Sequence, residues 1–197
     1  MTKSRLEAFS DGVIAIIITI MVLELKVPHV GERAAEFGDL KPLIPVFSSY
    51  VLSFVFVGIY WNNHHHMLTT VHRVNGAILW ANMHLLFWLS LIPFATAWSG
   101  RNPWERVPTA AYGAVLLMAG AAYWVLAHSL VDRHGSDSVL ARALGRDAKG
   151  LVSIAAYALS VAAAFLDPRL SYAGYVGVAL LWLVPDDRIE KAVAAER

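Results

Sequence analysis

The sequence predicts an all-α integral membrane protein with six transmembrane helices per subunit. Three observations predict it: 57% of the 197 residues are hydrophobic, only 16% are charged, and the mean hydropathy is +0.53. Soluble domains carry about a quarter of charged residues, so a chain this apolar is not expected to fold in water. Its length leaves room for one compact helical domain over residues 1–197 and for no second large one.

Six apolar segments define the expected helices, because a hydrocarbon core about 30 Å thick needs roughly 20 apolar residues per crossing. In chain order they are 6–26, 43–67, 77–98, 108–131, 150–166 and 171–184. The first ends at Glu24 and Lys26 and lacks a small-residue cleavage site, so we expect a retained helix. The polar connection 29–42 precedes the second and is expected to be an outer loop with a short helix. Pro93 interrupts the third near its outer end. The last two are short, so they should tilt little or lie in thinner, protein-lined surroundings.

The distribution of Lys and Arg predicts the orientation, because positive charge is retained on the cytoplasmic side. With both termini inside, ten basic residues fall in inner segments: Lys3, Arg5, Arg73, Arg133, Arg142, Arg146, Lys149, Arg188, Lys191 and Arg197. Six fall in outer segments: Lys26, Arg33, Lys41, Arg101, Arg106 and Arg169. We therefore predict a multi-pass protein of the cell membrane with both termini cytoplasmic.

Composition and motifs argue against several functional classes. The basic residues are dispersed and the net charge is +1, which argues against a nucleic-acid partner. Cysteine is absent, so neither a disulfide framework nor a thiolate metal site is possible. Nucleophile elbows, phosphate-binding loops and dinucleotide fingerprints are missing, so we expect no enzyme of the soluble type and no cofactor.

The first helix has two distinct faces. At about 100° per residue, Phe9, Gly12, Thr19, Ile20 and Leu23 all fall within about 60° of Ile16 and form one stripe of small or apolar residues. Ser10 and Asp11 lie about 120–140° away from Ile16, on a different side.

An aspartate inside a membrane helix costs on the order of 2.5–3.5 kcal/mol on insertion scales, so Asp11 should face protein and have a partner. The second helix ends with polar residues and the third begins with them, at the same depth as Ser10 and Asp11. They are Trp61, Asn62, Asn63, His64, His65, His66, Asn82 and His84. We predict a polar network that links the first three helices.

The segment from Arg5 to Asp11 carries the pattern R-x-x-x-F-S-D in Arg5, Phe9, Ser10 and Asp11. This pattern is similar to the signature of the transmembrane protein 175 family, potassium channels of endolysosomes with shorter bacterial relatives. The resemblance extends to residues 16–25, 61–66 and 82–94, whereas the last three helices match mainly in number.

The resemblance implies a homotetramer in the lipid bilayer, in which each subunit gives its first helix to a central potassium-permeable pore. It implies that Ile16 begins an apolar constriction, with Thr19 near the potassium-selective position and Ile20 and Leu23 further outward. It also implies that Arg5, Phe9, Ser10 and Asp11 hold the first helix against the second and third. Potassium would pass through the pore without being a resident metal.

The same residues permit a physical account of such a pore. A ring of Ile16 forms a narrow apolar neck that blocks ions by dewetting, and Thr19 hydroxyls can partly replace a hydration shell. A T-V-G-Y-G loop is missing, so selectivity for potassium over sodium should be modest. The alternatives are that Ile16, Ile20 and Leu23 face lipid or the bundle core and that Thr19 bonds its own helix. Glu24 either draws cations to the outer mouth or is an interfacial carboxylate.

Two other functional classes stay open. His64, His65 and His66, with His72 and His84, suggest a metal-dependent membrane enzyme. However, adjacent helical residues point 100° apart, and the H-E-x-x-H motif is missing. A secondary transporter is the second alternative, although no break in the second half matches Pro93.

Overall fold

The computed structural model describes residues 2–29, 31, 35–71, 73–135, 138–145 and 147–183, and every regular element among them is a helix. In chain order these are α1 (Lys3–Met21), η1 (Val22–Glu24), η2 (Phe37–Leu43), α2 (Ile44–Thr69), α3 (Gly76–Ser90), α4 (Ile92–Arg101), α5 (Arg106–His134), α6 (Val139–Leu144), α7 (Ala148–Ala163) and α8 (Pro168–Leu183). The residues of our predictions that lie outside the described part are Arg33, His72, Arg146, Val184, Arg188, Lys191 and Arg197.

Four helical segments of the described chain are long and apolar enough to cross a membrane: Lys3–Glu24, Phe37–Thr69, Gly76–Arg101 and Arg106–His134. The helices α7 and α8 have 16 residues each. At 1.5 Å per residue each is about 24 Å long, less than the hydrocarbon core of about 30 Å. The described residues therefore contain four candidate crossings and one shorter apolar helix, Ala148–Ala163, with α8 beside it, and six crossings remain a prediction.

The expected third segment, 77–98, corresponds to two helices that meet at Leu91. Asn75 caps the first of them, because its side chain accepts a hydrogen bond from the Ile78 N–H at 2.9 Å. Pro93 lies in the first turn of α4, where a missing N–H is tolerated. The Leu91 N–H bonds the Trp88 carbonyl instead of continuing the α-helical pattern.

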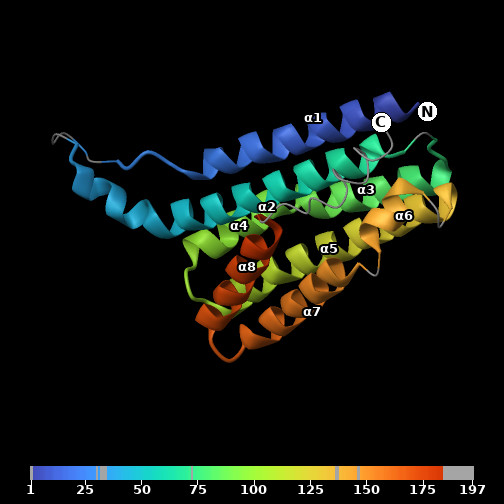
Figure 1. Ribbon diagram of the computed structural model, residues 1–197. Coiled ribbons are helices and arrows are strands. Elements are labelled where there is room, and N and C mark those ends of the chain that lie inside the picture. The colour runs from blue at the N-terminus through green and yellow to red at the C-terminus, as the bar shows by residue number, and fades with distance from the viewer. Residues whose placement is uncertain are drawn as a thin grey trace.

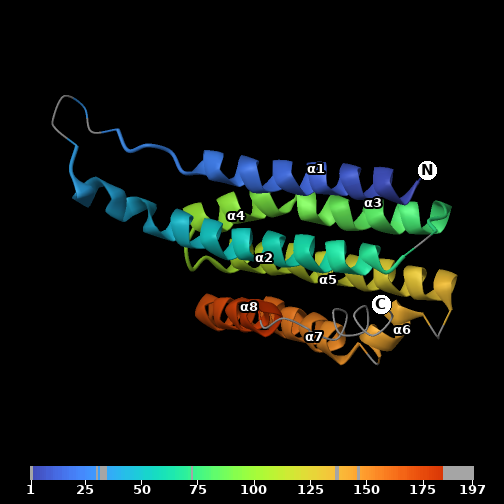
Figure 2. The same cartoon turned by 45° about the horizontal axis from the view of Figure 1, so that its top comes forward.

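The helices form an elongated bundle (Figure 1). α1 packs on α2, α3 and α4, while α5 contacts α3, α4, α7 and α8. Figure 2 shows α7 and α8 on the side of the bundle opposite α1. The short helix η2 and the start of α2 extend past the other helices. Among the described residues, α1 contacts its neighbours through one face only.

Hydroxyl groups bridge the helices inside this bundle. Ser53 of α2 bonds Tyr112 of α5 at 2.9 Å and accepts from Thr96 of α4 at 2.6 Å. Tyr175 of α8 donates to the Thr109 carbonyl of α5 at 3.1 Å. Such bonds join helices where no hydrophobic driving force acts between them, since lipid is as apolar as the core.

Candidate functional site

The helix α1 buries one face and exposes the other. Residues spaced by three or four lie against α2, α3 and α4; they are Leu6, Ser10, Ile14, Ile17 and Met21. The stripe around Ile16 lies on the exposed side, with exposed fractions of 58% for Ile16, 46% for Ile20 and 71% for Leu23. Apolar residues in such a stripe need a membrane or another protein surface beside them.

A buried hydrogen-bond chain fixes the rotation of α1. Asn82 of α3 donates through Nδ2 to Ser10 Oγ at 2.9 Å, and its Oδ1 lies 2.8 Å from His64 Nε2 of α2. An amide oxygen only accepts, so His64 Nε2 carries the proton of this bond. Ser10 in turn donates to the Leu6 carbonyl at 2.9 Å. One amide side chain therefore joins three helices.

Asp11 is held by a different partner. The Trp61 indole Nε1–H of α2 donates to Asp11 Oδ1 at 3.0 Å, and the His65 ring stacks on Trp61 with the ring centroids 6.1 Å apart. Asp11, Trp61 and His65 are all exposed in the single chain. The pair therefore lies at the edge of the contact between α1 and α2 and not within it.

Two residues of the signature are outside these bonds. Phe9 is half-exposed, and Arg5 is exposed and has no hydrogen bond or ion pair with the described residues. The structure thus brings together Ser10, His64 and Asn82, and separately Asp11, Trp61 and His65.

The histidines do not converge on one point. His64 bonds Asn82, His65 stacks on Trp61, and His84 accepts from Trp88 Nε1 at 2.9 Å on the outer surface of α3. Among the described residues, no three side chains of His, Cys, Asp or Glu are close enough to hold a metal ion.

The hydroxyl of Thr19 is turned back to its own helix. Its Oγ1 lies 3.1 Å from the Ala15 carbonyl and 3.0 Å from the Ile16 carbonyl, to which it donates. Because a hydroxyl also carries two lone pairs, Thr19 still offers an oxygen acceptor on the exposed side of α1.

An ion pair at the end of η1 has no signal in the sequence. Glu24 pairs with Arg101 of α4, which lies 77 residues away in the chain. Beside this pair, Ile20, Pro93, Phe94 and Trp98 line a hollow between α1 and α4. From the sequence, Glu24 was expected to be an interfacial carboxylate or to draw cations to the outer mouth, since nothing in the pattern connects it to Arg101.

Known proteins resemble this chain along most of its length. Residues 5–93 match a family model described as the endosomal/lysosomal potassium channel TMEM175. A protein of Chryseobacterium sp. (strain P1-3) named a potassium channel is 51% identical over 193 residues, which cover 98% of each chain. A mouse protein named endosomal/lysosomal proton channel TMEM175 is 30% identical over 118 residues, covering 54% of this chain and 24% of the mouse protein.

A solved structure resembles the whole bundle. It is the crystal structure of a protein from Chamaesiphon minutus described as a homolog of the lysosomal potassium-selective channel TMEM175. Its TM-score is 0.79 at 29% sequence identity, with coverage of 94% of this chain and 98% of that one. All of these proteins are named as ion channels and not as enzymes.

Proposed function

The chain belongs to the TMEM175 family of membrane channels, and from this premise we propose that it is a potassium-permeable cation channel with a pore lined by α1. The observation that carries the proposal is the exposed stripe of Ile16, Ile20 and Leu23 on a helix whose opposite face is fixed to its own bundle. A stripe of this kind, repeated in four copies around an axis, lines a passage.

Permeation follows from the residues of that stripe. The four Ile16 side chains form the apolar neck, which excludes ions when it is dry and conducts when small outward movements of α1 let water in. The Thr19 hydroxyl oxygens lie one turn further along and contact the dehydrated cation. Ile20 and Leu23 continue the apolar lining outward. Side-chain hydroxyls, in place of stacked carbonyl rings, give a modest preference for potassium over sodium.

The assembly is a homotetramer in the cell membrane with both termini in the cytoplasm. Cyclic symmetry turns each inward side chain into a ring of four, so one stripe per subunit suffices. In this orientation Glu24 lies at the outer mouth, where its pairing with Arg101 reduces the negative charge offered to incoming cations.

The neck is tested by Ile16→Asn in proteoliposomes under potassium and sodium gradients, with a pH gradient as a separate arm. A polar ring holds water, so we expect a conductance several-fold above that of the wild type and a reversal potential moved toward that of a non-selective pore. The control is Leu180→Asn, since Leu180 of α8 is 59% exposed, like Ile16, but lies on the far side of the bundle. Unchanged permeation and selectivity in Ile16→Asn would place the neck elsewhere.

The same recordings separate the competing functions. Current that survives chelators argues against a metal-dependent enzyme, and flux without saturation or a coupling ion argues against a secondary transporter. Reversal that follows the pH gradient instead of the potassium gradient would make protons the main permeating ion, as the name of the mouse relative suggests.

A further inference from the structure

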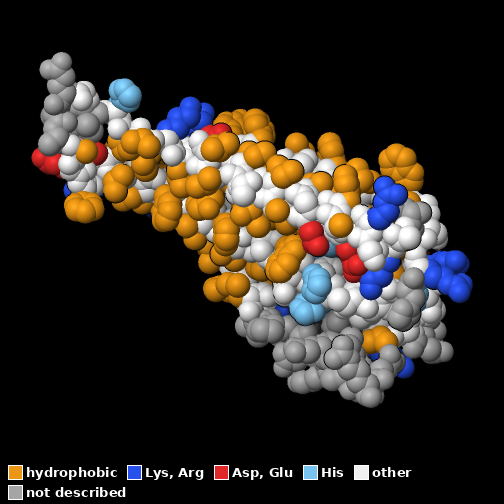
Figure 3. Space-filling view, turned by 90° about the horizontal axis from the view of Figure 1, so that it is seen from above, with side chains coloured by type: hydrophobic (Ala, Val, Ile, Leu, Met, Phe, Trp, Pro, Cys, Tyr) orange, Lys and Arg blue, Asp and Glu red, His pale blue; other side chains and the backbone are white. Residues whose placement is uncertain are grey.

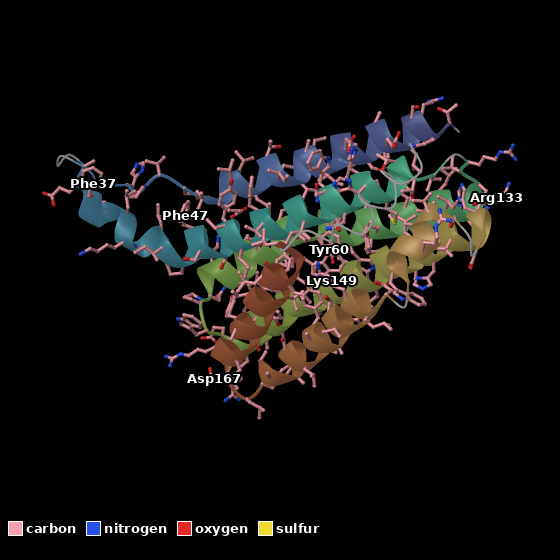
Figure 4. All side chains as sticks on the ribbon, in the orientation of Figure 1. Phe37, Phe47, Tyr60, Arg133, Lys149 and Asp167 are labelled. Atoms are coloured by element: carbon pink, nitrogen blue, oxygen red, sulfur yellow. The ribbon has the colours of Figure 1, made fainter. Side chains whose placement is uncertain are left out.

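A cavity lies within the subunit, away from α1, where α2, α5, α7 and α8 meet. Its accessible interior volume is about 40 Å³, and the empty space reaches about 480 Å³ only when the open solvent at its mouth is included. Its lining residues are Phe56, Ile59, Tyr60, Asn63, Gly120, Tyr123, Trp124, Asp147, Gly150, Ser153, Tyr157 and Trp182. Figure 4 shows Tyr60 and Lys149 in this region, below the middle of α2.

Aromatic rings form most of the cavity wall and hold one another in place. Tyr123 contacts Tyr60 and Trp182 edge-on, with centroid distances of 6.2 Å and 6.5 Å. The indole Nε1–H of Trp182 donates to Ser153 Oγ at 2.8 Å, which fixes the ring on α7. Lys149 Nζ lies 4.8 Å from the centroid of Trp182, so one face of this ring is already occupied by a cation of the chain itself.

One carboxylate lies in the wall. Asp147 begins α7 with a left-handed backbone (φ +45°) and accepts a hydrogen bond from the Gly150 N–H at 3.3 Å. A Cβ on Gly150 would lie 2.7 Å from both carboxylate oxygens, so the glycine makes room for the acid. Burial raises the pKa of Asp147, and the charge of His128 opposes this rise. Lys149, two residues further along the chain, places its ammonium group over Trp182 of the same wall.

Two phenol groups in the wall have unused hydrogen-bonding capacity. Tyr157 is 3% exposed and Tyr60 is 9% exposed, and neither hydroxyl has a hydrogen-bond partner among the described residues. The Tyr60 hydroxyl and the Tyr157 ring approach each other at Gly120, where an added Cβ would lie 3.7 Å from each. Neither phenol oxygen is among the fully buried atoms without a partner in the described chain, so both can be reached from the cavity by a polar group.

We propose that this cavity binds a small organic ammonium ion, either a free amine or the ammonium headgroup of a lipid. Aromatic faces attract weakly hydrated organic cations, and Asp147 supplies the opposite charge. An inorganic cation is a poorer fit, because hard cations need several oxygen ligands and the wall offers mostly ring carbon. This binding site is independent of the channel activity.

The direct test is calorimetric titration of the purified full-length protein with choline and with 3,3-dimethylbutanol, which has the same shape without the charge. We expect saturable binding of choline and an affinity for the alcohol that is at least about tenfold weaker. Equal affinities would show an apolar pocket only, and no saturable choline binding would remove the site altogether.

Matched variants locate the binding. Asp147→Asn keeps an acceptor for the Gly150 N–H but removes the charge, and should weaken choline binding about tenfold. Its control is Asp167→Asn, since Asp167 accepts from the Arg169 N–H at the opposite end of α7. Gly120→Ala narrows the cavity without a clash and should also weaken binding, whereas Gly177→Ala points into open space and should not. Unchanged affinity in both cavity variants would overturn the proposal.

The lipid composition distinguishes the two sources of the ammonium group. In vesicles of ethanolamine phospholipid, a headgroup that occupies the cavity competes with choline and lowers its apparent affinity several-fold relative to vesicles of glycerol phospholipid. The same affinity in both vesicles assigns the site to a free amine.

Discussion

The side chain of Asn82 of α3 links α1 to α2. Its amide bonds Ser10 and His64 at once, and all three residues are buried. Interhelical hydrogen bonds in membrane proteins average about 0.6 kcal/mol, because the unfolded segments also find partners in the membrane. Asn82 makes two such bonds, and its removal would leave two buried groups without a partner. Its contribution to stability should therefore exceed this average.

We expect Asn82→Ala to lower the free energy of unfolding by about 1–2 kcal/mol. Unfolding in mixed micelles with increasing dodecyl sulfate measures this. Asn102→Ala is the matched control, because Asn102 is exposed and donates only to the Trp98 carbonyl of its own helix. Both hydrogen bonds depend on Asn82. The further loss in the free energy of unfolding when Ser10→Ala is added to Asn82→Ala should therefore be smaller than the loss caused by Ser10→Ala in the wild type. If the two losses in unfolding free energy were strictly additive, the hydrogen bonds of Ser10, Asn82 and His64 would not act as a unit.

The polar residues near the N-terminal end of α1 were predictable as a group but not as pairs. Helical periodicity and depth place Ser10, His64 and Asn82 at one level, which is enough to expect contact. The choice of partners depends on rotamers and on the exact rotation of each helix, which the pattern does not contain. Arg5 was expected to hold α1 only because of the family resemblance, and it has no hydrogen bond or ion pair with the described residues.

At the scale of elements, α7 and α8 form a tightly packed hairpin. Ser171 donates to the Ser160 carbonyl at 2.6 Å, across the turn. A Cβ on Gly174 would lie only 2.0 Å from Ser160 Oγ, so the hairpin closes at this glycine. The contact positions the lower wall of the aromatic cavity, since Tyr157 and Trp182 lie on the same two helices.

Gly174→Ala should therefore destabilise the protein by about 1–3 kcal/mol, as overpacking does in a well-filled core. Adding Ser160→Ala removes the hydroxyl and leaves the Ser160 Cβ as the nearest atom at 3.2 Å, so most of the loss should be recovered. Unfolding of the single and double variants measures the recovery, with Gly177→Ala as the control in open space. If the double variant were as unstable as Gly174→Ala, the added Cβ would clash with the backbone of α7 and not with the Ser160 hydroxyl.

The elements differ in how far the sequence predicts them. The length of an apolar run identifies a membrane helix well, because the bilayer sets the length of the helix. It does not reveal where a helix is interrupted. The run 77–98 has the composition of one helix, and only the missing N–H of Pro93 indicates the break at Leu91. The short helix α6 was not predicted, because six residues fall far below the length that a search for membrane spans detects.

The whole molecule has the charge distribution of a membrane protein. In Figure 3, apolar side chains cover the long middle of the visible face, while most Lys, Arg, Asp and Glu side chains lie toward its two ends. This band includes the outward side of α1, which no other helix of the described part of the chain covers. A lone subunit would leave Asp11 at that surface with one hydrogen bond from Trp61.

Assembly explains this exposed carboxylate and makes it testable. An acidic side chain against lipid costs on the order of 2.5–3.5 kcal/mol on insertion scales, so in the proposed tetramer we expect Asp11 to gain a polar contact with the next subunit. We expect native mass spectrometry to show a particle of four times the 21.6 kDa subunit. The Asp11→Ala assembly should dissociate at a lower detergent concentration and at less dilution than the wild type. The reversal potential of the remaining channels should stay unchanged. Asp167→Ala, also a carboxylate but at the turn between α7 and α8, is the control. A monomeric wild-type particle would contradict this role of Asp11. An Asp11→Ala tetramer that is as stable as the wild type but has altered selectivity would contradict it too, and would indicate that Asp11 acts on the permeating ion.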